Sequence, residues 1–263
     1  MCTVAIYARV WERFPLVLVG NRDEFSTRGW REPGAHWRES PALFAPKDCV
    51  SGGSWLGVNG AGLACTVLNQ GRTSSVGRDR RSRGELVISA LAAGSLDDAR
   101  RYAESLDASD YLGFHLLLAD AGEVCLVSSA AGGLQLKALP AGVHLLSSRG
   151  VNDDECPKSR RLLARMRAQV PAQPDRDRWR FARALLSTRA APGQKDGFWI
   201  ELGGGYGTRS SAIVAVEAQP HTAGTGQRWH FWHSRPEPHP QPPLPLVEYQ
   251  AGAIGSARSD VAC

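Results

Sequence analysis

The chain has 263 residues, of which 43% are hydrophobic and 22% are charged, which is ordinary for a globular protein with a sizeable core. Its net charge of +5 is carried almost entirely by arginine, because there are only four lysines, Lys47, Lys137, Lys158 and Lys195. Acidic residues are interspersed and no long basic stripe occurs, so nucleic acid is not an expected partner.

The six cysteines show neither a C-x-x-C pair nor the spacing of a zinc site, so no metal is expected. Several lie in apolar runs, where a thiol behaves as a small hydrophobe, and this indicates a reducing compartment. Charged residues at Arg9, Glu12 and Arg13 interrupt the apolar start, as a signal peptide would not. We therefore expect a cytoplasmic protein without a membrane span, because its apolar runs are too short.

Four short apolar runs in the first part of the chain predict strands. They are Thr3 to Ala8, Leu16 to Gly20, Ser54 to Asn59 and Leu63 to Leu68. Turn signals lie between the members of each pair, so two hairpins are expected. Residues 25 to 50, which lie between the hairpins, are punctuated by proline and are expected to form a long loop.

Two helices are expected next, over Gly84 to Ala93 and, after an N-cap at Ser95, to about Leu106. Further strands are expected over Phe114 to Ala119, Glu123 to Ser128, Leu134 to Leu139, Val143 to Leu146, Ser211 to Ala218 and Arg228 to Trp232. Two amphipathic, arginine-rich helices are expected over Pro157 to Gln169 and Arg176 to Ser187.

Tight turns link most of these strands, which indicates antiparallel pairing and an α+β fold. A four-layer α-β-β-α sandwich of antiparallel sheets fits the order of elements. Residues 1 to 235 are expected to form one domain. The proline-dense and then small, polar residues 236 to 263 predict a disordered tail.

Cys2 is the first candidate for chemistry. A small second residue normally allows Met1 to be removed, which would leave Cys2 with a free α-amine. The amine has a pKa of about 8 and the thiol of about 8.5, so each can help to activate the other. An N-terminal amine is a known built-in base for acyl transfer, although a chance cysteine at this position is the alternative.

The charged sequence Asn21-Arg22-Asp23-Glu24 follows the second strand, and the predicted hairpin would return it to the side of Cys2. A carboxylate there can hold the ammonium group of residue 2, and a guanidinium can lower the pKa of the thiol. The alternative is a solvated loop of alternating charge.

Three other motifs are less informative. The run from Gly52 to Gly57 lacks the Lys-Ser/Thr of a phosphate-binding loop, so nucleotide binding is not expected. Arg78 to Arg83 predicts a solvated basic loop, with an anion contact as the alternative. His230 and His233 alternate with tryptophans in a predicted strand, although histidine can also bind haem iron.

Several ordered motifs in residues 1 to 235 together resemble one known family. They are "NRDEF", "STRGWREP", "FAPKDCVSGGSWLGVNGAGLACTVLNQ", "SRGEL", "GFHLL" and "YGTRSS". The sequence resembles the NRDE family, also called the transport-and-Golgi-organisation protein 2 family. That family is similar in fold to N-terminal-nucleophile (Ntn) hydrolases of the cysteine type, such as choloylglycine hydrolase and penicillin V acylase, which cleave linear amides.

The resemblance implies catalytic roles for Cys2, Arg22, Glu24, Asn69 and Arg209. Cys2 matches the nucleophile, and Glu24, or else Asp23, matches the carboxylate that orients the amine. Arg22 and Arg209 match positive groups near the nucleophile, and Asn69 matches a side chain of the oxyanion hole.

One departure from the family pattern concerns the block Leu145-Leu146-Ser147-Ser148, where the hydrolases carry asparagine and this chain has Ser148. A hydroxyl offers one hydrogen-bond donor where the amide offers two, and Asn152 is a nearby candidate to replace it. The residues expected to bind substrate are Asp23, Trp55, Ser148 and Asn152.

Two functions follow from these expectations. The first is a cysteine Ntn hydrolase or acyltransferase that acts without a cofactor on an amide, ester or thioester of a small molecule. The second, implied by the resemblance, is a non-catalytic protein of haem trafficking or of lipid and acyl-CoA homeostasis, with haem or a lipid in the same pocket. Ser148 favours the second function and the intact set around Cys2 favours the first, and the oligomeric state stays open.

Overall fold

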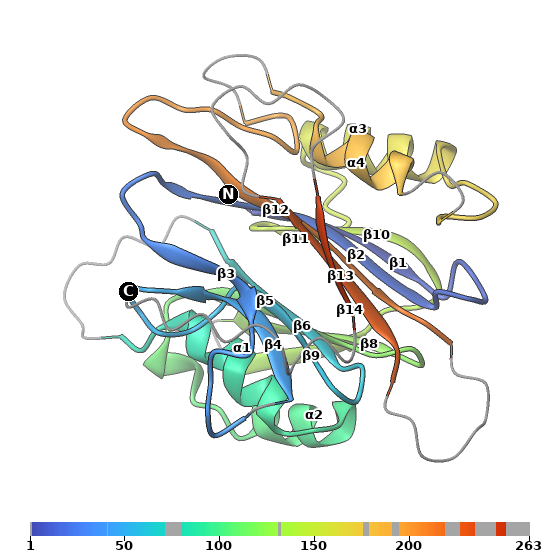
Figure 1. Cartoon of the computed structure of the whole chain (residues 1–263). Helices are drawn as coiled ribbons and strands as arrows, with labels where there is room; N and C mark the ends of the chain where they lie inside the picture. The colour runs from blue at the N-terminus through green and yellow to red at the C-terminus, as the bar shows by residue number, and fades with distance from the viewer. Residues whose placement is uncertain are drawn as a thin grey trace.

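The computed structural model describes residues 2–40, 42–71, 80–130, 133–175, 179–190, 195–218, 227–234 and 246–250. Within these ranges, fourteen strands form two antiparallel sheets of seven strands each, and four α-helices accompany them. The two sheets lie face to face, and the helices lie outside them (Figure 1).

The first sheet has the strand order β11-β10-β1-β2-β12-β13-β14. Its strands are β1 (Thr3–Ala8), β2 (Leu16–Phe25), β10 (Gly142–Ser147), β11 (Gly150–Val151), β12 (Tyr206–Val216), β13 (Trp229–Ser234) and β14 (Val247–Gln250). The second sheet runs in chain order from β3 to β9. Its strands are β3 (Trp30–Gly34), β4 (Leu43–Asp48), β5 (Leu56–Asn59), β6 (Ala64–Asn69), β7 (Phe114–Ala119), β8 (Val124–Ala130) and β9 (Gly133–Ala138).

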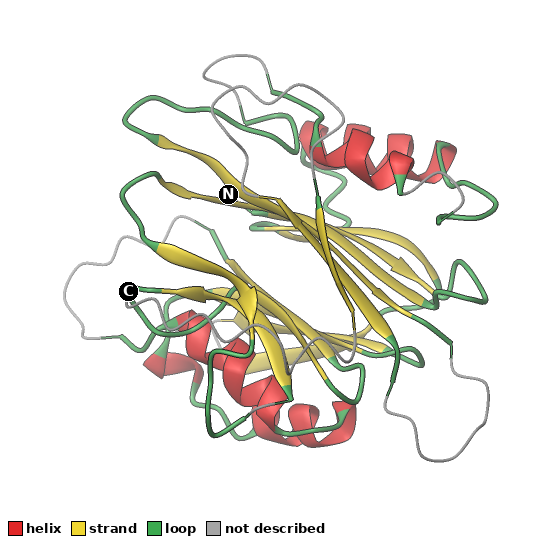
Figure 2. Cartoon of the chain, in the orientation of Figure 1, coloured by secondary structure: helices red, strands yellow, loops and turns green. Residues whose placement is uncertain are grey.

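The helices cover the outer faces of the two sheets (Figure 2). They are α1 (Arg83–Ala92), α2 (Leu96–Glu104), α3 (Pro157–Ala168) and α4 (Arg180–Leu186), and a short 3₁₀ turn spans Ala108–Asp110. The first two lie against the second sheet, and α3 and α4 lie against the first (Figure 1). This arrangement confirms the predicted four-layer α-β-β-α sandwich.

Side chains that alternate between the two faces of each strand explain why three separate hydrophobic cores form. In β1, Val4 and Ile6 belong to the core between the two sheets, whereas Ala5 and Tyr7 belong to the core beneath α3 and α4. Successive side chains of a strand point to opposite faces of its sheet, so one apolar strand serves both layers. A third core lies between the second sheet and the helices α1 and α2.

The predicted N-cap at Ser95 is confirmed, and α1 has a cap of the same kind. The side chain of Ser95 accepts a hydrogen bond from the backbone N–H of Asp98 at the start of α2, and Ser82 accepts one from Gly84 at the start of α1. Pro157 opens α3, where its missing N–H is not needed. No helix in the described ranges is long and apolar enough to cross a membrane.

The expectation of a long loop over residues 25 to 50 is wrong, because β3 and β4 lie within it. Pro33 favoured the prediction of a loop, because proline has no backbone N–H to donate to a neighbouring strand. It is tolerated because β3 is an edge strand and its pairing with β4 shifts register between Arg31 and Gly34.

Two further boundaries differ from the sequence-based expectation. Strand β2 continues to Phe25, because β12 pairs with it as far as Tyr206, so the Asn21-Arg22-Asp23-Glu24 sequence lies inside a strand. In the tail that was expected to be disordered, Val247–Gln250 form β14 by pairing with the open edge of β13. The remainder of that tail and residues 176–178 of a predicted helix lie outside the described residues.

Candidate active site

A cavity of about 350 Å³ lies where the ends of β1, β2, β4 and β6 meet the start of α1. Six of the predicted site residues line it: Cys2, Arg22, Asp23, Glu24, Trp55 and Asn69. Residues far apart in the chain therefore converge on one space, as the sequence predicted. Cys2 and Arg22 also line a smaller space of about 20 Å³ that extends into the core between the sheets.

The strand register places Cys2 beside Arg22. Thr3 pairs with Asn21, so continuing the register by one residue sets Cys2 opposite Arg22. Cys2 packs with Val4 against the core between the sheets, so its side chain lies on the inner face of the first sheet.

Burial raises the pKa of the Cys2 thiol, and the charge of Asp23 adds to this effect. A hydrogen bond from the Asp23 backbone and the charge of Arg22 act in the opposite direction without reversing it. Formation of a nucleophilic thiolate at this position therefore requires a base that takes the thiol proton.

Arg22 is held on the inner face by two contacts. Its Nη2 donates to Oδ2 of Asp48 at 2.9 Å, and its guanidinium lies over the ring of Trp55, 4.2 Å from the ring centroid. Only 5% of the residue is exposed. A buried guanidinium held by a carboxylate and an aromatic ring keeps a positive charge beside Cys2.

Asp23 points to the other face of β2 and flanks the amino side of Cys2. Its Oδ1 accepts a hydrogen bond from the Thr208 hydroxyl at 2.8 Å, and it is 5% exposed. Burial raises the pKa of the Asp23 carboxyl, and the Thr208 hydrogen bond and the charge of Lys158 oppose that rise. Asp23 is therefore a buried carboxylate whose charge acts on the Cys2 thiol.

Glu24, which the sequence favoured as the carboxylate that orients the α-amine, lies elsewhere. Its Oε2 is 3.9 Å from Nη2 of Arg22 and 3.8 Å from Nε of Arg28, and its Oε1 accepts a hydrogen bond from the Phe25 backbone. Neighbouring side chains in a strand point to opposite faces of the sheet. The Glu24 side chain therefore lies on the face of Arg22, and the Asp23 side chain lies on the opposite face, at the amino side of Cys2. These contacts place Glu24 with the arginines and Asp23 with Thr208, and the assignment of the orienting carboxylate to either residue stays a prediction.

Asn69 ends a strand of the second sheet, whereas Ser148 follows strand β10 of the first sheet. Asn69 ends β6 and lines the cavity, where its exposed amide can donate hydrogen bonds. The backbone N–H of Gly71 donates to the carbonyl of Ser148 at 2.9 Å, which joins the β10–β11 turn to the end of β6. Ser148 is buried and follows Ser147, the partner of Thr3, but it is not among the lining residues.

Asn152 and Arg209 are not brought into the cavity. Oδ1 of Asn152 accepts from the Leu145 N–H, and its Nδ2 lies 2.9 Å from Nδ1 of His144, so its amide is used to hold β10. It therefore does not replace an asparagine at Ser148. Arg209 donates from Nε to the carbonyl of Glu24 at 3.2 Å and also binds the Gly205 carbonyl, which fastens β12 to β2.

Sequence reasoning missed Asp48, which organises the mouth of the cavity. Besides Arg22, its carboxylate accepts from Nε of Arg28 at 2.7 Å and from the backbone N–H of Ser51 at 2.9 Å. Because Asp48 lies in the second sheet and Arg22 in the first, this cluster joins the sheets across the site. The "KDCVSGGSW" run lies within one of the family motifs, but the expected loop gave Asp48 no partner.

Close backbone contact between Gly53 and Gly84 sets the position of α1 against this cluster. A Cβ atom on Gly53 would lie 2.6 Å from the Gly84 carbonyl oxygen, whereas one on Gly60 would meet only Ala42, at 3.5 Å. We expect Gly53→Ala to destabilise the protein by about 1–3 kcal/mol through overpacking, and Gly60→Ala to cost less than about 1 kcal/mol. Urea unfolding of the two variants checks this, and equal midpoints would contradict it.

The two seven-stranded antiparallel sheets and the helices outside them form an Ntn-hydrolase-like fold. An orthologue of N-acylethanolamine-hydrolyzing acid amidase from Caenorhabditis elegans superposes with a TM-score of 0.54 at 7% identity, over 81% of this chain and 92% of that one. The R18L variant of conjugated bile acid hydrolase from Clostridium perfringens gives 0.51 at 11% identity, over 95% of this chain and 92% of that one. At these identities the likeness shows the fold alone.

The chain belongs to the Transport and Golgi organisation 2 family, whose family model matches residues 1–230. The bovine Transport and Golgi organization protein 2 homolog is 29% identical to it over 144 residues. That alignment covers 51% of this chain and 51% of the bovine protein, so the match spans about half the length of the curated relative.

Proposed function

We propose that the protein is a cysteine Ntn hydrolase or acyltransferase that acts on an amide, ester or thioester of a small molecule through Cys2. One observation carries the proposal: the Cys2 side chain lines a cavity, and the buried Asp23 carboxylate flanks its amino side. This is the arrangement that an N-terminal nucleophile with its own amine as base requires.

In the proposed reaction, removal of Met1 leaves the α-amine on Cys2, and this amine takes the thiol proton. The thiolate sulfur attacks the carbonyl carbon, and Asp23 stabilises the resulting ammonium group. The ammonium group then gives its proton to the departing amine, alcohol or thiol, which leaves a thioester on Cys2. Attack by water, or by an acceptor amine, regenerates the enzyme.

The amide of Asn69 supports the same reaction as a donor to the carbonyl oxygen as it becomes an oxyanion. Asn69 lines the cavity with Cys2 from the facing sheet, and loss of one such donor typically lowers kcat by about 10²–10³-fold. The buried Ser148 does not line the cavity, so the proposed oxyanion site does not use its hydroxyl.

The test combines N-terminal mass determination with an acylating probe. We expect the intact mass to lack Met1, and p-nitrophenyl acetate to add one acetyl group to the Cys2 peptide, which hydroxylamine removes as expected of a thioester. Cys2→Ala is expected to lose this adduct completely. Retention of Met1, or equal labelling of Cys2→Ala, would overturn the proposed mechanism.

The haem-trafficking and lipid-homeostasis alternative and the cytoplasmic location stay predictions. Within the described residues, no group of three histidine, cysteine, aspartate or glutamate side chains is placed to hold a metal ion. Titration with haem distinguishes the alternative: a saturable Soret band that survives Cys2→Ala, in a protein that the acyl probe leaves unmodified, would favour ligand carriage over catalysis.

A further inference from the structure

Positive charge exceeds negative charge around Cys2. The cavity is lined by five arginines, Arg22, Arg28, Arg80, Arg81 and Arg83, but by only three carboxylates, Asp23, Glu24 and Asp48. Asp48 is shared by Arg22 and Arg28, and Arg81 pairs with Glu85 at 2.6 Å. A surplus of two positive charges therefore remains in the lining.

Arg80 and Arg83 carry that surplus. In the described part of the chain neither forms an ion pair: Arg83 donates from Nη1 to the Gly113 carbonyl at 3.1 Å, and Arg80 donates to the Tyr111 carbonyl at 3.4 Å. Burial lowers the pKa of Arg83, while the charges of Cys2 and Glu24 oppose this, which places Arg83 within electrostatic reach of the nucleophile.

A buried hydrogen-bond donor in the same cavity also lacks an acceptor. Nη2 of Arg22 binds Asp48, but Nη1, on a residue that is 5% exposed, has no hydrogen-bond partner among the described residues. A buried donor left unsatisfied costs about 1–3 kcal/mol, and more when it is charged. Such a donor indicates an acceptor that arrives with a ligand.

The start of α1 adds a third feature that favours an anion. Ser82, Arg83 and Gly84 line the cavity, and Ser82 is the N-cap of this ten-residue helix. The N-terminus of a helix carries partial positive charge that stabilises a nearby phosphate or carboxylate, and here the charge acts through the field of the helix because the Gly84 N–H already donates to the Ser82 side chain.

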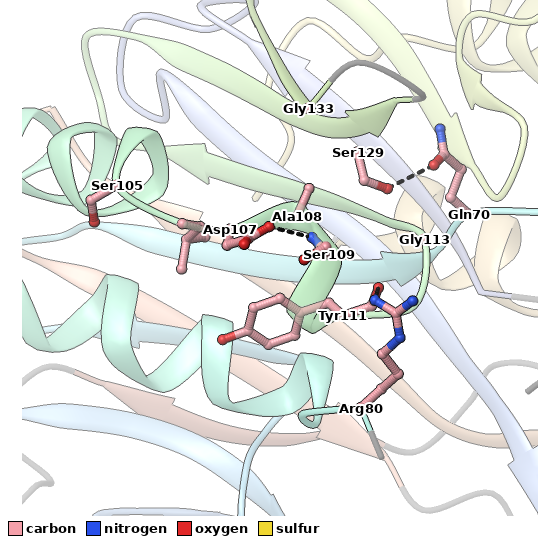
Figure 3. Close-up of a pocket in the computed structure, with 11 residues that line it drawn as sticks. Gln70, Arg80, Ser105, Asp107, Ala108, Ser109, Tyr111, Gly113, Ser129 and Gly133 are labelled. Atoms are coloured by element: carbon pink, nitrogen blue, oxygen red, sulfur yellow. Dashed lines mark hydrogen bonds between the residues drawn. The ribbon is translucent and has the colours of Figure 1, made fainter. Parts of the chain in front are cut away.

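The neighbouring pocket of about 870 Å³ does not offer an equivalent site. Figure 3 shows the residues that line this pocket, among them Arg80, which also lines the Cys2 cavity. Two of its other side chains already have partners in the protein, since Ser129 donates to Gln70 at 2.8 Å and Asp107 accepts from the Ser109 backbone at 2.7 Å.

We propose that the Cys2 cavity selects substrates that carry an anionic group, a carboxylate or a phosphate, bound by Arg83, by Nη1 of Arg22 and by the N-terminus of α1. The inference rests on the proposed function, because it assumes that the acyl carbonyl of the same molecule lies at Cys2. Arg83 then determines specificity, and uncharged amides of the same size bind less tightly.

Alkylation of Cys2 tests this without requiring catalysis. Iodoacetate and iodoacetamide are nearly the same size and differ by one negative charge, and mass spectrometry of the Cys2 peptide gives the rate for each reagent. We expect Arg83→Gln to lower the ratio of the iodoacetate rate to the iodoacetamide rate about tenfold, as loss of one charged hydrogen bond implies. Any change in the thiol pKa acts on both reagents and cancels in the ratio.

Arg160→Gln is the matched control, because Arg160 is an exposed residue of α3 outside the cavity and its loss changes net charge equally. An unchanged ratio in Arg83→Gln, or an equal fall in Arg160→Gln, would overturn the proposal. An altered ratio in a protein that forms no thioester would support the anion site and contradict only the catalytic proposal.

Protection of the wild-type protein gives a second measurement that needs no variant. Inorganic phosphate and acetate are each expected to slow alkylation of Cys2 more than sodium chloride at the same ionic strength. Stronger protection by phosphate identifies a phosphate-bearing substrate, and stronger protection by acetate identifies a carboxylate. Protection no greater than that of chloride contradicts the site.

Discussion

Asp23→Asn is expected to slow acylation of Cys2 by about 10²–10⁴-fold, the range that a positioned acid–base system contributes to catalysis. Asparagine keeps the shape and the Thr208 hydrogen bond of Asp23 but cannot stabilise the ammonium group of residue 2. The measurement is the pseudo-first-order rate of labelling by p-nitrophenyl acetate, read on the Cys2 peptide.

Glu24→Gln is the matched control, because it removes the neighbouring carboxylate, which faces Arg22 and Arg28 instead. We expect it to change the rate less than about tenfold, because Glu24 is a half-buried partner at the long distances of 3.8–3.9 Å and such pairs contribute little. A large fall in the labelling rate of Glu24→Gln, together with a normal rate in Asp23→Asn, would show that Glu24 and not Asp23 orients the amine.

Asp48→Asn is expected to destabilise the protein by about 3–5 kcal/mol at pH 7, because a buried charge loses its counterion. The Arg22 side chain that Asp48 neutralises is 5% exposed and cannot turn to water without opening the contact between the sheets. Arg28 is 34% exposed and contributes less to the expected loss. Urea unfolding at pH 7 measures the difference.

The pH dependence of that difference has a definite sign. Burial alone would raise the pKa of Asp48, but hydrogen bonds from Arg28 and Ser51 and the charge of Arg22 hold it below its usual value. A carboxylate whose pKa is lowered by folding contributes stability above its unfolded pKa of about 3.9 and loses it as the pH falls through the folded value.

The wild-type protein and Asp48→Asn are therefore expected to differ fully at pH 7 and to converge below about pH 4. Asp154→Asn, an exposed site in the turn before α3, is the control and should change stability by less than about 0.5 kcal/mol at either pH. A difference that persists undiminished at pH 3 would show that the charge of Asp48 is not what stabilises the fold.

Local signals were enough for most of the fold. The hairpin of β1 and β2, the caps at Ser82 and Ser95, and the proline that opens α3 act through neighbouring residues, so the sequence displays them directly. The strands β3, β4 and β14 were missed, because β3 and β4 are held by pairing with each other and β14 by pairing with β13, and this pairing overrides the local preference of proline-containing segments.

The candidate site, like the fold, could be predicted only in part from the sequence. Cys2 and the charged segment from Arg22 to Glu24 could be placed together from a short hairpin and from the family motifs. The choice between Asp23 and Glu24 could not be predicted, because it depends on the strand register, which decides which of the two side chains lies on the face at the amino side of Cys2.

By itself, the sequence determined that a cysteine near the start of the chain would lie beside a strand carrying Arg22, Asp23 and Glu24, because tight turns pair neighbouring strands. Only the tertiary structure decided that Asp23 flanks Cys2 and that Asp48 and Arg83 reach the same cavity from the second sheet and from α1. The physical reason is burial: the packing of the two sheets desolvates these charges and so determines which of them have partners and which arginine nitrogen has none among the described residues.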